Sequence, residues 1–135
     1  MKALTLIRPW PYAIFRLGKD VENRGWKPPK SVIGQRIAIH AGAKWDYHAT
    51  EWIYKTTGDR SISRQYLSPR GIVGTVRVVS CFPCLPDEPD AHNRWASGPW
   101  CWLLAGPFEL LEPIPCKGTL GLWEVPEEIA RRIER

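Results

Sequence analysis

Short strand-like runs that do not alternate regularly with helices constrain the fold of this 135-residue chain more than any other feature of its sequence. The runs are apolar or β-branched and lie at residues 3–7, 34–42, 71–81, 99–105 and 119–125. In a doubly wound parallel sheet each strand would be followed by a helix, and this chain lacks that order. We therefore predict an α+β fold, a small mixed β-barrel of about five to six strands flanked by two to three helices.

Helical spacing and terminal signals predict the helices. They fall at residues 10–17, at residues 43–57, and in a short C-terminal segment after Pro126. Gly18 and Gly58 stand where the C-terminal caps of the first two helices are expected. In the second helix the apolar stripe includes Trp45 and Trp52. Lys19 is therefore expected at the exit of a short helix, held by the chain on both sides.

Length and composition favour a single domain over residues 1–135, since no linker, repeat or low-complexity run interrupts the chain. Lys2 is followed by apolar residues, but Arg8, Pro9 and Pro11 interrupt them before a signal-peptide core could form. No apolar run reaches the length of a membrane span. We expect a cytoplasmic protein with no membrane partner.

Positive charge is concentrated in the first part of the chain. Residues 1–80 hold 14 Lys and Arg against 5 Asp and Glu, whereas residues 81–135 hold 5 against 9. A basic region of this kind is typical of a face that binds phosphates. The composition therefore favours nucleic acid as the partner, with RNA or a single strand preferred, although many small basic domains bind none.

Residues 17–26 read Leu-Gly-Lys-Asp-Val-Glu-Asn-Arg-Gly-Trp and bring three charges of interest together, Lys19, Glu22 and Arg24. In an extended segment side chains two residues apart share a face, so Glu22 and Arg24 would project together with Lys19 just before them. Two cations around a carboxylate can bind an anion or move a proton. The alternative is a solvated edge strand whose charges only prevent aggregation. We expect Lys19 and Arg24 to be at least partly solvated beside a cleft.

Eight tryptophans are heavy usage for a chain of this length. Trp10, Trp26 and Trp45 lie next to basic residues or turns, where an aromatic ring can stack on a splayed base while cations hold its phosphates. Four others are expected in the core: Trp52, Trp100, Trp102 and Trp123.

His40 is expected to end the strand at residues 34–42, where it could act as a general base, contact a phosphate, or serve as a hydrogen-bonded structural residue. Cys81 and Cys84 have the spacing of a metal knuckle, but Cys101 and Cys116 are isolated. A zinc site needs four ligands at tetrahedral distances, so reduced thiols are the preferred interpretation and zinc stays open. We expect no cofactor and assign no metal ligand.

The chain resembles the ASCH (activating-signal-cointegrator homology) family of the PUA-like superfamily. The residues that match the family signature are Gly18, Lys19, Glu22 and Arg24. Further resemblance to small stand-alone members lies at residues 8–10, 34–42, 71–74, 98–102, 113–118 and 121–123. In total the resemblance to the family runs from about residue 3 to residue 126. In many members one residue separates the glycine from the lysine, whereas here Gly18 directly precedes Lys19.

The resemblance implies a PUA-like β-barrel with a cleft beside the signature that receives RNA or another nucleic acid. Some members are enzymes: amidohydrolases that remove the acetyl group from acetylated cytidine, or metal-dependent ribonucleases. In the amidohydrolases the signature lysine is catalytic, a threonine stands at the position of Glu22, and a second carboxylate comes from later in the chain. Glu22 therefore departs from the amidohydrolase pattern.

Three functional hypotheses follow. The first is a nucleic-acid-binding domain that recognises RNA or a modified base, with ligand contacts from Arg8, Trp10, Lys19, Glu22, Arg24, Trp26, His40 and Trp45. The second is a hydrolase acting on a nucleoside or RNA, with Lys19, Glu22 and His40 as the catalytic residues. The third is a protein-interaction domain, in which the tryptophans would form an exposed patch. A pocket deep enough for one base would favour the enzyme, a broad positive groove with no pocket would favour the binder, and a flat apolar patch would favour the protein-interaction domain.

Overall fold

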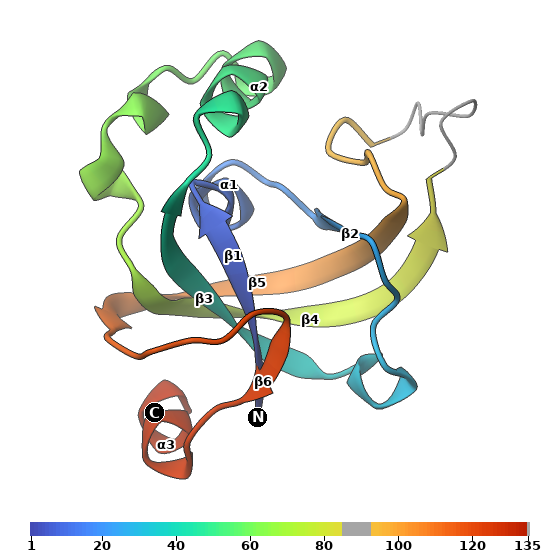
Figure 1. Cartoon of the computed structure of the whole chain (residues 1–135), viewed down its shortest axis with the longest axis vertical. Coiled ribbons are helices and arrows are strands. Elements are labelled where there is room, and N and C mark those ends of the chain that lie inside the picture. The colour runs from blue at the N-terminus through green and yellow to red at the C-terminus, as the bar shows by residue number, and fades with distance from the viewer. Residues whose placement is uncertain (85–92, 135) are drawn as a thin grey trace.

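A computed structural model describes residues 1–84 and 93–134, and within them six strands form one mixed sheet that curves into a half-barrel (Figure 1). The spatial order of the strands is β2-β5-β4-β3-β1-β6. The strands are β1 (Lys2–Arg8), β2 (Val21–Arg24), β3 (Arg36–Trp45), β4 (Gly71–Pro83), β5 (Trp100–Ile114) and β6 (Leu122–Glu124). This confirms the predicted α+β class, with a six-stranded barrel-like sheet.

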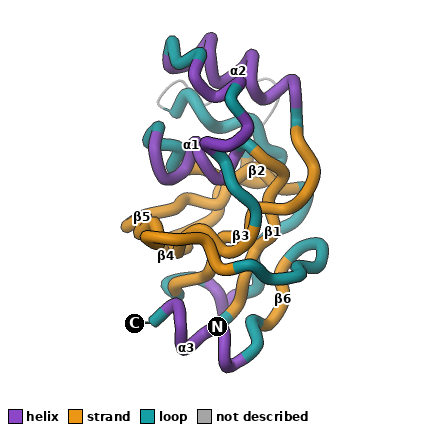
Figure 2. The backbone as a smooth tube through the Cα atoms, turned by 90° about the vertical axis from the view of Figure 1, so that its left-hand side faces the viewer, coloured by secondary structure: helices purple, strands orange, loops and turns teal. Residues whose placement is uncertain are grey.

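Three α-helices and three single-turn 3₁₀ helices accompany the sheet in the described part of the chain. The α-helices are α1 (Trp10–Arg16), α2 (Tyr47–Thr57) and α3 (Glu127–Ile133), and the 3₁₀ turns are η1 (Lys30–Val32), η2 (Ser61–Ser63) and η3 (Gln65–Leu67). Figure 2 shows α1 and α2 at one end of the sheet and α3 at the other. None of the described helices is both long and apolar enough to cross a lipid bilayer.

Strand pairing leaves β2 and β6 as the two edges of the sheet. β1 and β3 are parallel, and every other pair of neighbours is antiparallel. The edge strands are also the shortest, with four and three residues, whereas β4 and β5 have 13 and 15. The half-barrel is therefore open between β2 and β6, and because β6 pairs only with residues 2–4 of β1, the rest of β1 also borders this opening.

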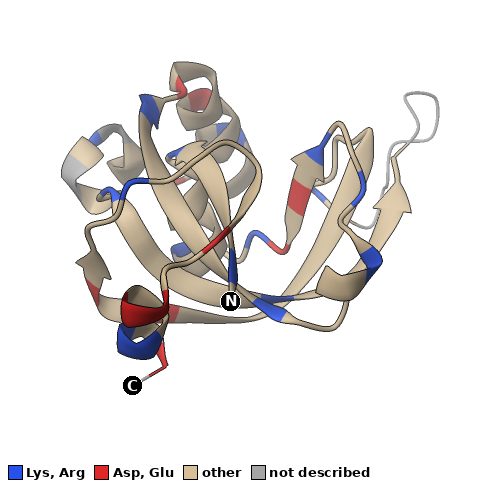
Figure 3. Cartoon of the chain, turned by 60° about the horizontal axis from the view of Figure 1, so that its bottom comes forward, with Lys and Arg blue, Asp and Glu red and all other residues tan. Residues whose placement is uncertain are grey.

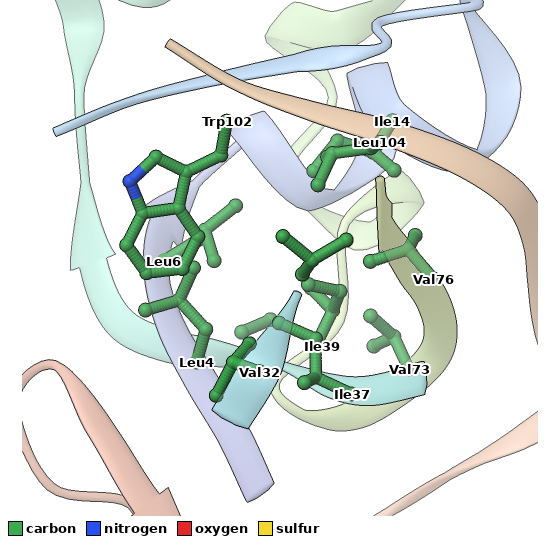
Figure 4. Close-up of a cluster of buried hydrophobic side chains, with 12 residues drawn as sticks. Leu4, Leu6, Ile14, Val32, Ile37, Ile39, Val73, Val76, Trp102 and Leu104 are labelled. Carbon is green, nitrogen blue, oxygen red and sulfur yellow. The ribbon is translucent and has the colours of Figure 1, made fainter. Parts of the chain in front are cut away.

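The main core fills the concave side of the sheet (Figure 4). Alternate residues of the strands supply it, as Ile37 and Ile39 on β3 illustrate. Trp102 lies in this core with no exposed surface, as predicted. The other three tryptophans expected in the core are only half-buried: Trp52, Trp100 and Trp123.

The segment after His40 differs from its prediction, since β3 continues to Trp45 and α2 begins only at Tyr47. The physical reason is the side chain of Asp46, whose Oδ1 accepts hydrogen bonds from the amides of His48 and Ala49 at 2.9 and 3.1 Å. An N-cap of this kind fixes the first turn of a helix. His40 consequently lies within a strand and not at its end, and Trp45 belongs to the sheet.

β5 is more than twice as long as predicted because the chain passes through Gly106 and Pro107 without leaving the sheet. The pairing with β4 shifts register between Thr75 and Arg77, opposite this Gly-Pro pair, and Gly106 has a φ of 55°. Such a bulge accommodates a proline, which has no N–H to donate to the ladder. β6 is shorter than the predicted run at 119–125, since residues 115–121 form a loop.

Candidate functional site

A pocket of about 940 Å³ lies at the open side of the half-barrel. It is bordered by β2, by the second half of β3 with the first half of α2, and by the loop at residues 115–121. The residues lining it include Thr5, Trp10, Lys19, Glu22, Asn23, Arg24, His40, Lys44, Asp46, Trp52, Arg70 and Lys117. Five of the eight predicted ligand contacts are therefore brought together here: Trp10, Lys19, Glu22, Arg24 and His40.

Lys19, Glu22 and Arg24, which we call the charged triad, form a continuous set of ion pairs. Lys19 Nζ lies 3.2 Å from Glu22 Oε1, and Arg24 Nε donates to Glu22 Oε2 at 3.1 Å. Lys19 Nζ also donates to the carbonyl oxygen of Val21. The two oxygens of one carboxylate are thus shared between two cations, as the spacing in an extended strand predicts.

The end of α1 explains how Lys19 reaches this position. Gly18 adopts a φ of 73°, and the amide of Lys19 donates to the carbonyl of Ala13 at 3.0 Å. This left-handed turn ends the helix and directs the next residue inward. Lys19 is only 3% exposed and Glu22 7%. The expectation that Lys19 is partly solvated is therefore wrong, and a solvated edge strand does not describe these two residues.

The side chain of Arg24 spans the open side of the half-barrel. Its Nη2 donates to the carbonyl oxygen of Thr5 at 2.8 Å, although β2 and β1 are not neighbours in the sheet. The side chain keeps about a fifth of its surface exposed, as predicted. Arg24 therefore joins the triad to the opposite strand and still faces the pocket.

Two tryptophans form an aromatic wall beside the triad. The rings of Trp10 and Trp52 meet edge to face, with centroids 5.0 Å apart and planes at 79°. Lys19 Nζ lies 5.1 Å from the centroid of Trp10, within the range of a cation–π contact. Trp52, which the sequence placed in the core, lines the pocket instead.

His40 belongs to a neutral network at the other side of the pocket. Its Nε2 lies 2.7 Å from the carbonyl oxygen of Cys116, and its Nδ1 lies 3.2 Å from Thr5 Oγ1. A carbonyl only accepts, so Nε2 carries a proton, and neutral His40 then accepts from the Thr5 hydroxyl at Nδ1. Trp123 Nε1 donates to the same hydroxyl oxygen at 2.9 Å. Every polar group of this network is paired, which favours the structural alternative for His40.

Three predicted contact residues lie outside the pocket lining: Arg8, Trp26 and Trp45. Arg8 is 8% exposed, and its guanidinium lies 5.4 Å from the ring centroid of Trp45. Trp26 packs edge to face on Trp102, and its carbonyl oxygen accepts a hydrogen bond from Trp102 Nε1 at 3.0 Å. It is 39% exposed. These contacts give the three residues packing roles around the pocket.

Asn23 and Thr5 were not predicted as site residues. Asn23 Oδ1 accepts from the amides of Ser97 and Gly98 at 2.8 and 2.9 Å, and its Nδ2 donates to the carbonyl of Trp95 at 2.9 Å. It therefore holds residues 95–98 beside the pocket. In the sequence, the indication for Asn23 is its position between Glu22 and Arg24. Its hydrogen-bond partners lie more than 70 residues away along the chain, so the sequence could not identify them.

The cysteines do not offer the donor set of a metal site. All four are free, and burial raises the pKa of Cys101 to about 11, with the neighbouring Cys84 as the next cause. Burial also raises the pKa of Cys81 and of Cys116. Thiolates are the species that ligate metals and react. In the described residues, no group of three or more His, Cys, Asp or Glu side chains is placed to hold a metal ion.

Comparison with known proteins adds no relative to this picture. No protein-family model matches the chain, and a search of curated proteins found no match.

Proposed function

We propose that this protein is a nucleic-acid-binding domain of the ASCH type, within the PUA-like superfamily, and that it binds RNA or another single strand with one base in the pocket. The observation that carries the proposal is the charged triad, which lines a pocket of about 940 Å³ and in which Lys19 and Glu22 are buried. Pockets that bind small molecules commonly enclose about 300–1,000 Å³. The signature residues thus line a space large enough for a base and its sugar.

The triad and the aromatic wall offer complementary contacts to a base. Glu22 has two acceptor oxygens for exocyclic amines or ring N–H groups, while Arg24 supplies donors for base carbonyls. Trp10 and Trp52 provide apolar surface for stacking, which favours single-stranded over paired bases. Basic residues on many elements add the charge that phosphates require (Figure 3).

A pocket that can hold one base is the feature that we expected to favour an enzyme, so the same pocket supports a second candidate function, a hydrolase acting on a nucleoside or RNA. We place the binding domain first because Glu22 departs from the amidohydrolase pattern. Lys19 and Glu22 stand 3.2 Å apart at the floor, where an ammonium could polarise a carbonyl oxygen and a carboxylate could move a proton. Nucleophilic attack by Lys19 is less favoured. Its partners are a carboxylate, a backbone carbonyl and an aromatic face, all of which suit the charged form.

The third hypothesis, an exposed tryptophan patch for a protein partner, has less support. All eight tryptophans are among the described residues, and among them only Trp26, at 39%, is exposed. A single exposed ring is common on protein surfaces and marks no interface.

Binding can be tested by fluorescence anisotropy with a labelled eight-nucleotide single-stranded RNA and the matching duplex. We expect the single strand to bind more tightly, with an affinity that falls steeply between 50 and 200 mM salt, on the order of tenfold or more for several phosphate contacts. Arg24→Gln should weaken binding by about 1–3 kcal/mol. Arg132→Gln, on α3 and outside the pocket lining, is the matched control. No binding of the single strand at low salt would overturn the proposal.

Turnover distinguishes the second candidate. Purified protein would be incubated with acetylated cytidine, without added metal, and the released acetate measured. We expect little or no release, because Glu22 stands where the amidohydrolases have threonine. Robust release that is lost in Lys19→Arg, a variant that keeps the charge, would make the protein an enzyme first.

A further inference from the structure

The cationic side chains that line the pocket fall into two groups. Those of the charged triad pair with Glu22, and the others are exposed at the mouth of the pocket. At the mouth, Lys44, Arg70 and Lys117 are exposed and line the pocket, and they form no ion pair with the described residues. The carboxylates among the lining residues are Glu22, which the triad engages, and Asp46, which caps α2. Three cations, Lys44, Arg70 and Lys117, thus stand against the single carboxylate of Asp46, so the mouth keeps a net positive charge.

Arg8 ties together the two segments that carry Lys44 and Arg70. Its guanidinium donates to the carbonyls of Gly42 and Ala43 at 2.9 and 3.0 Å, directly before Lys44. It also donates to the carbonyl of Ser68 at 3.1 Å, two residues before Arg70. One buried side chain thus fixes the end of β3 against the chain that enters β4. The backbone segments that carry Lys44 and Arg70 are therefore fixed relative to each other, while the two side chains remain exposed.

The arrangement also places like charges near one another. Burial lowers the pKa of Arg8, and the charge of Arg70 lowers it further. An anion placed beside Arg70 would relieve this repulsion, since opposite charge favours the protonated guanidinium. β5 ends at Ile114, three residues before Lys117, and a Cβ on Gly71, next to Arg70, would stand 2.6 Å from the carbonyl oxygen of Ile114. Lys44, Arg70 and Lys117 thus come from three different segments of the chain and line the same pocket.

We propose that Lys44 and Arg70, with Lys117 beside them, bind a phosphate group of the ligand, and that Arg8 positions them. The inference rests on the proposed function and deepens it, because it makes the ligand a phosphorylated nucleotide and not a free nucleoside or base. The phosphate can belong to a mononucleotide or to a strand, and both carry the same recognised group. Arginine and lysine are the side chains that form charge-assisted hydrogen bonds to phosphate.

Calorimetric titration of the full chain tests this proposal. The probes are the four ribonucleosides, their 5′- and 3′-monophosphates, inorganic phosphate and an eight-nucleotide single-stranded RNA. The variant is Lys44→Gln/Arg70→Gln. The matched control is Lys30→Gln/Arg132→Gln, which removes the same charge from η1 and α3, outside the pocket lining.

For the wild type we expect at least one monophosphate to bind about tenfold or more tightly than its parent nucleoside. In Lys44→Gln/Arg70→Gln the ratio should fall to near one, and in the control it should persist. If instead only the RNA binds measurably, its affinity should fall by about tenfold in Lys44→Gln/Arg70→Gln, which would identify the phosphate of a strand.

The outcomes separate this inference from the proposed function. Nucleosides that bind as tightly as their monophosphates, and lose affinity in Arg24→Gln, would overturn the phosphate site and leave the base pocket standing. Inorganic phosphate that binds only the wild type and the control, with no gain from a nucleoside or an RNA, would keep the phosphate site and overturn the nucleic-acid function. RNA affinity that is equal in wild type and Lys44→Gln/Arg70→Gln would also overturn the phosphate site.

Arg8→Lys separates positioning from general structure. Lysine keeps the charge but cannot donate to three carbonyls in the planar fork of an arginine. We expect the ratio of monophosphate to nucleoside affinity to fall several-fold in this variant. A merely structural role would lower both affinities together and leave the ratio unchanged, and that result would overturn the positioning role.

Discussion

Two buried polar networks border the pocket, and they differ in charge and in what they leave open to a ligand. The charged triad places one carboxylate between two cations, Lys19 and Arg24, at 3.2 and 3.1 Å. The second network, around His40, is neutral and links Thr5, Trp123 and the carbonyl of Cys116. Each contains buried polar side chains, Lys19 and Glu22 in the first and His40 in the second, but only the first contains ionised groups that face the pocket with acceptor and donor capacity to spare.

Thr5 belongs to both networks through different atoms. Its carbonyl oxygen accepts from Arg24 at 2.8 Å, whereas its hydroxyl contacts His40 and Trp123 at 3.2 and 2.9 Å. A ligand that replaces a hydrogen bond of the triad can therefore leave the contacts of the Thr5 hydroxyl in place. The comparison indicates that the triad recognises the ligand and that the His40 network supports the wall behind it.

The largest effect is expected when the triad loses one cation. In Lys19→Met the stem still packs beside Trp10, but Glu22 keeps only Arg24 as its charged partner. Removing one partner of a buried ion pair costs about 3–5 kcal/mol, so we expect the free energy of unfolding to fall by that amount. Urea denaturation followed by tryptophan fluorescence measures it.

A double variant shows whether the loss comes from the stranded charge. In Lys19→Met/Glu22→Gln the carboxylate charge is gone as well, and the stability should recover to within about 1–2 kcal/mol of the wild type. If Lys19→Met alone costs less than about 1 kcal/mol, Glu22 is more solvated than its 7% exposure indicates.

The second effect concerns the neutral network. His40→Phe keeps an aromatic ring but leaves the carbonyl of Cys116 and the hydroxyl of Thr5 without their partner. An unpaired buried group costs about 1–3 kcal/mol, so we expect a loss of about 2–3 kcal/mol in the free energy of unfolding. RNA affinity should fall less than in Arg24→Gln. A larger fall would return His40 to the binding or catalytic role that the sequence had suggested.

Local patterns predicted much of the fold and the centre of the site. The two-residue period brought Glu22 and Arg24 to one face, and Gly18 marked the turn that delivers Lys19. Boundaries were less accurate. The helical stripe from Trp45 onward hid the N-cap at Asp46, and the strand predicted at residues 99–105 ended where the sheet only bulges.

Long-range contacts account for what the sequence could not supply. His40 pairs with the carbonyl of Cys116, 76 residues later, and Trp123 donates to Thr5 across 118 residues. The carbonyl of Cys116 is a backbone acceptor that carries no residue identity, and the Thr5 hydroxyl lies too far along the chain from Trp123 for a local pattern to reveal the pair. The burial of Lys19 was missed for a related reason: its charge indicated solvent, but Glu22, the Val21 carbonyl and Trp10 compensate it inside the protein.

A smaller effect is expected where the loop at residues 115–121 rests on His40. A Cβ on Gly118 would stand 2.5 Å from two ring atoms of His40 and 2.9 Å from Thr5 Oγ1. In Gly118→Ala the loop must shift, and overpacking of this kind costs about 1–3 kcal/mol. Gly25→Ala is the matched control, because a Cβ there meets nothing within 4 Å. Thermal denaturation compares the two, and equal melting temperatures would show that the loop does not rest on His40.

The smallest effect should come from Thr5→Val, which removes the hydroxyl that serves the His40 network and keeps the carbonyl that serves Arg24. Trp123 Nε1 and His40 Nδ1 each lose a neutral partner, so the free energy of unfolding should fall by about 1–2 kcal/mol. Because the backbone contact of Arg24 remains, RNA affinity should stay well above that of Arg24→Gln. Anisotropy titrations of the two variants under one salt condition measure the difference. If Thr5→Val weakens RNA binding as much as Arg24→Gln does, the two networks act as one unit, and ligand recognition extends from the triad to His40.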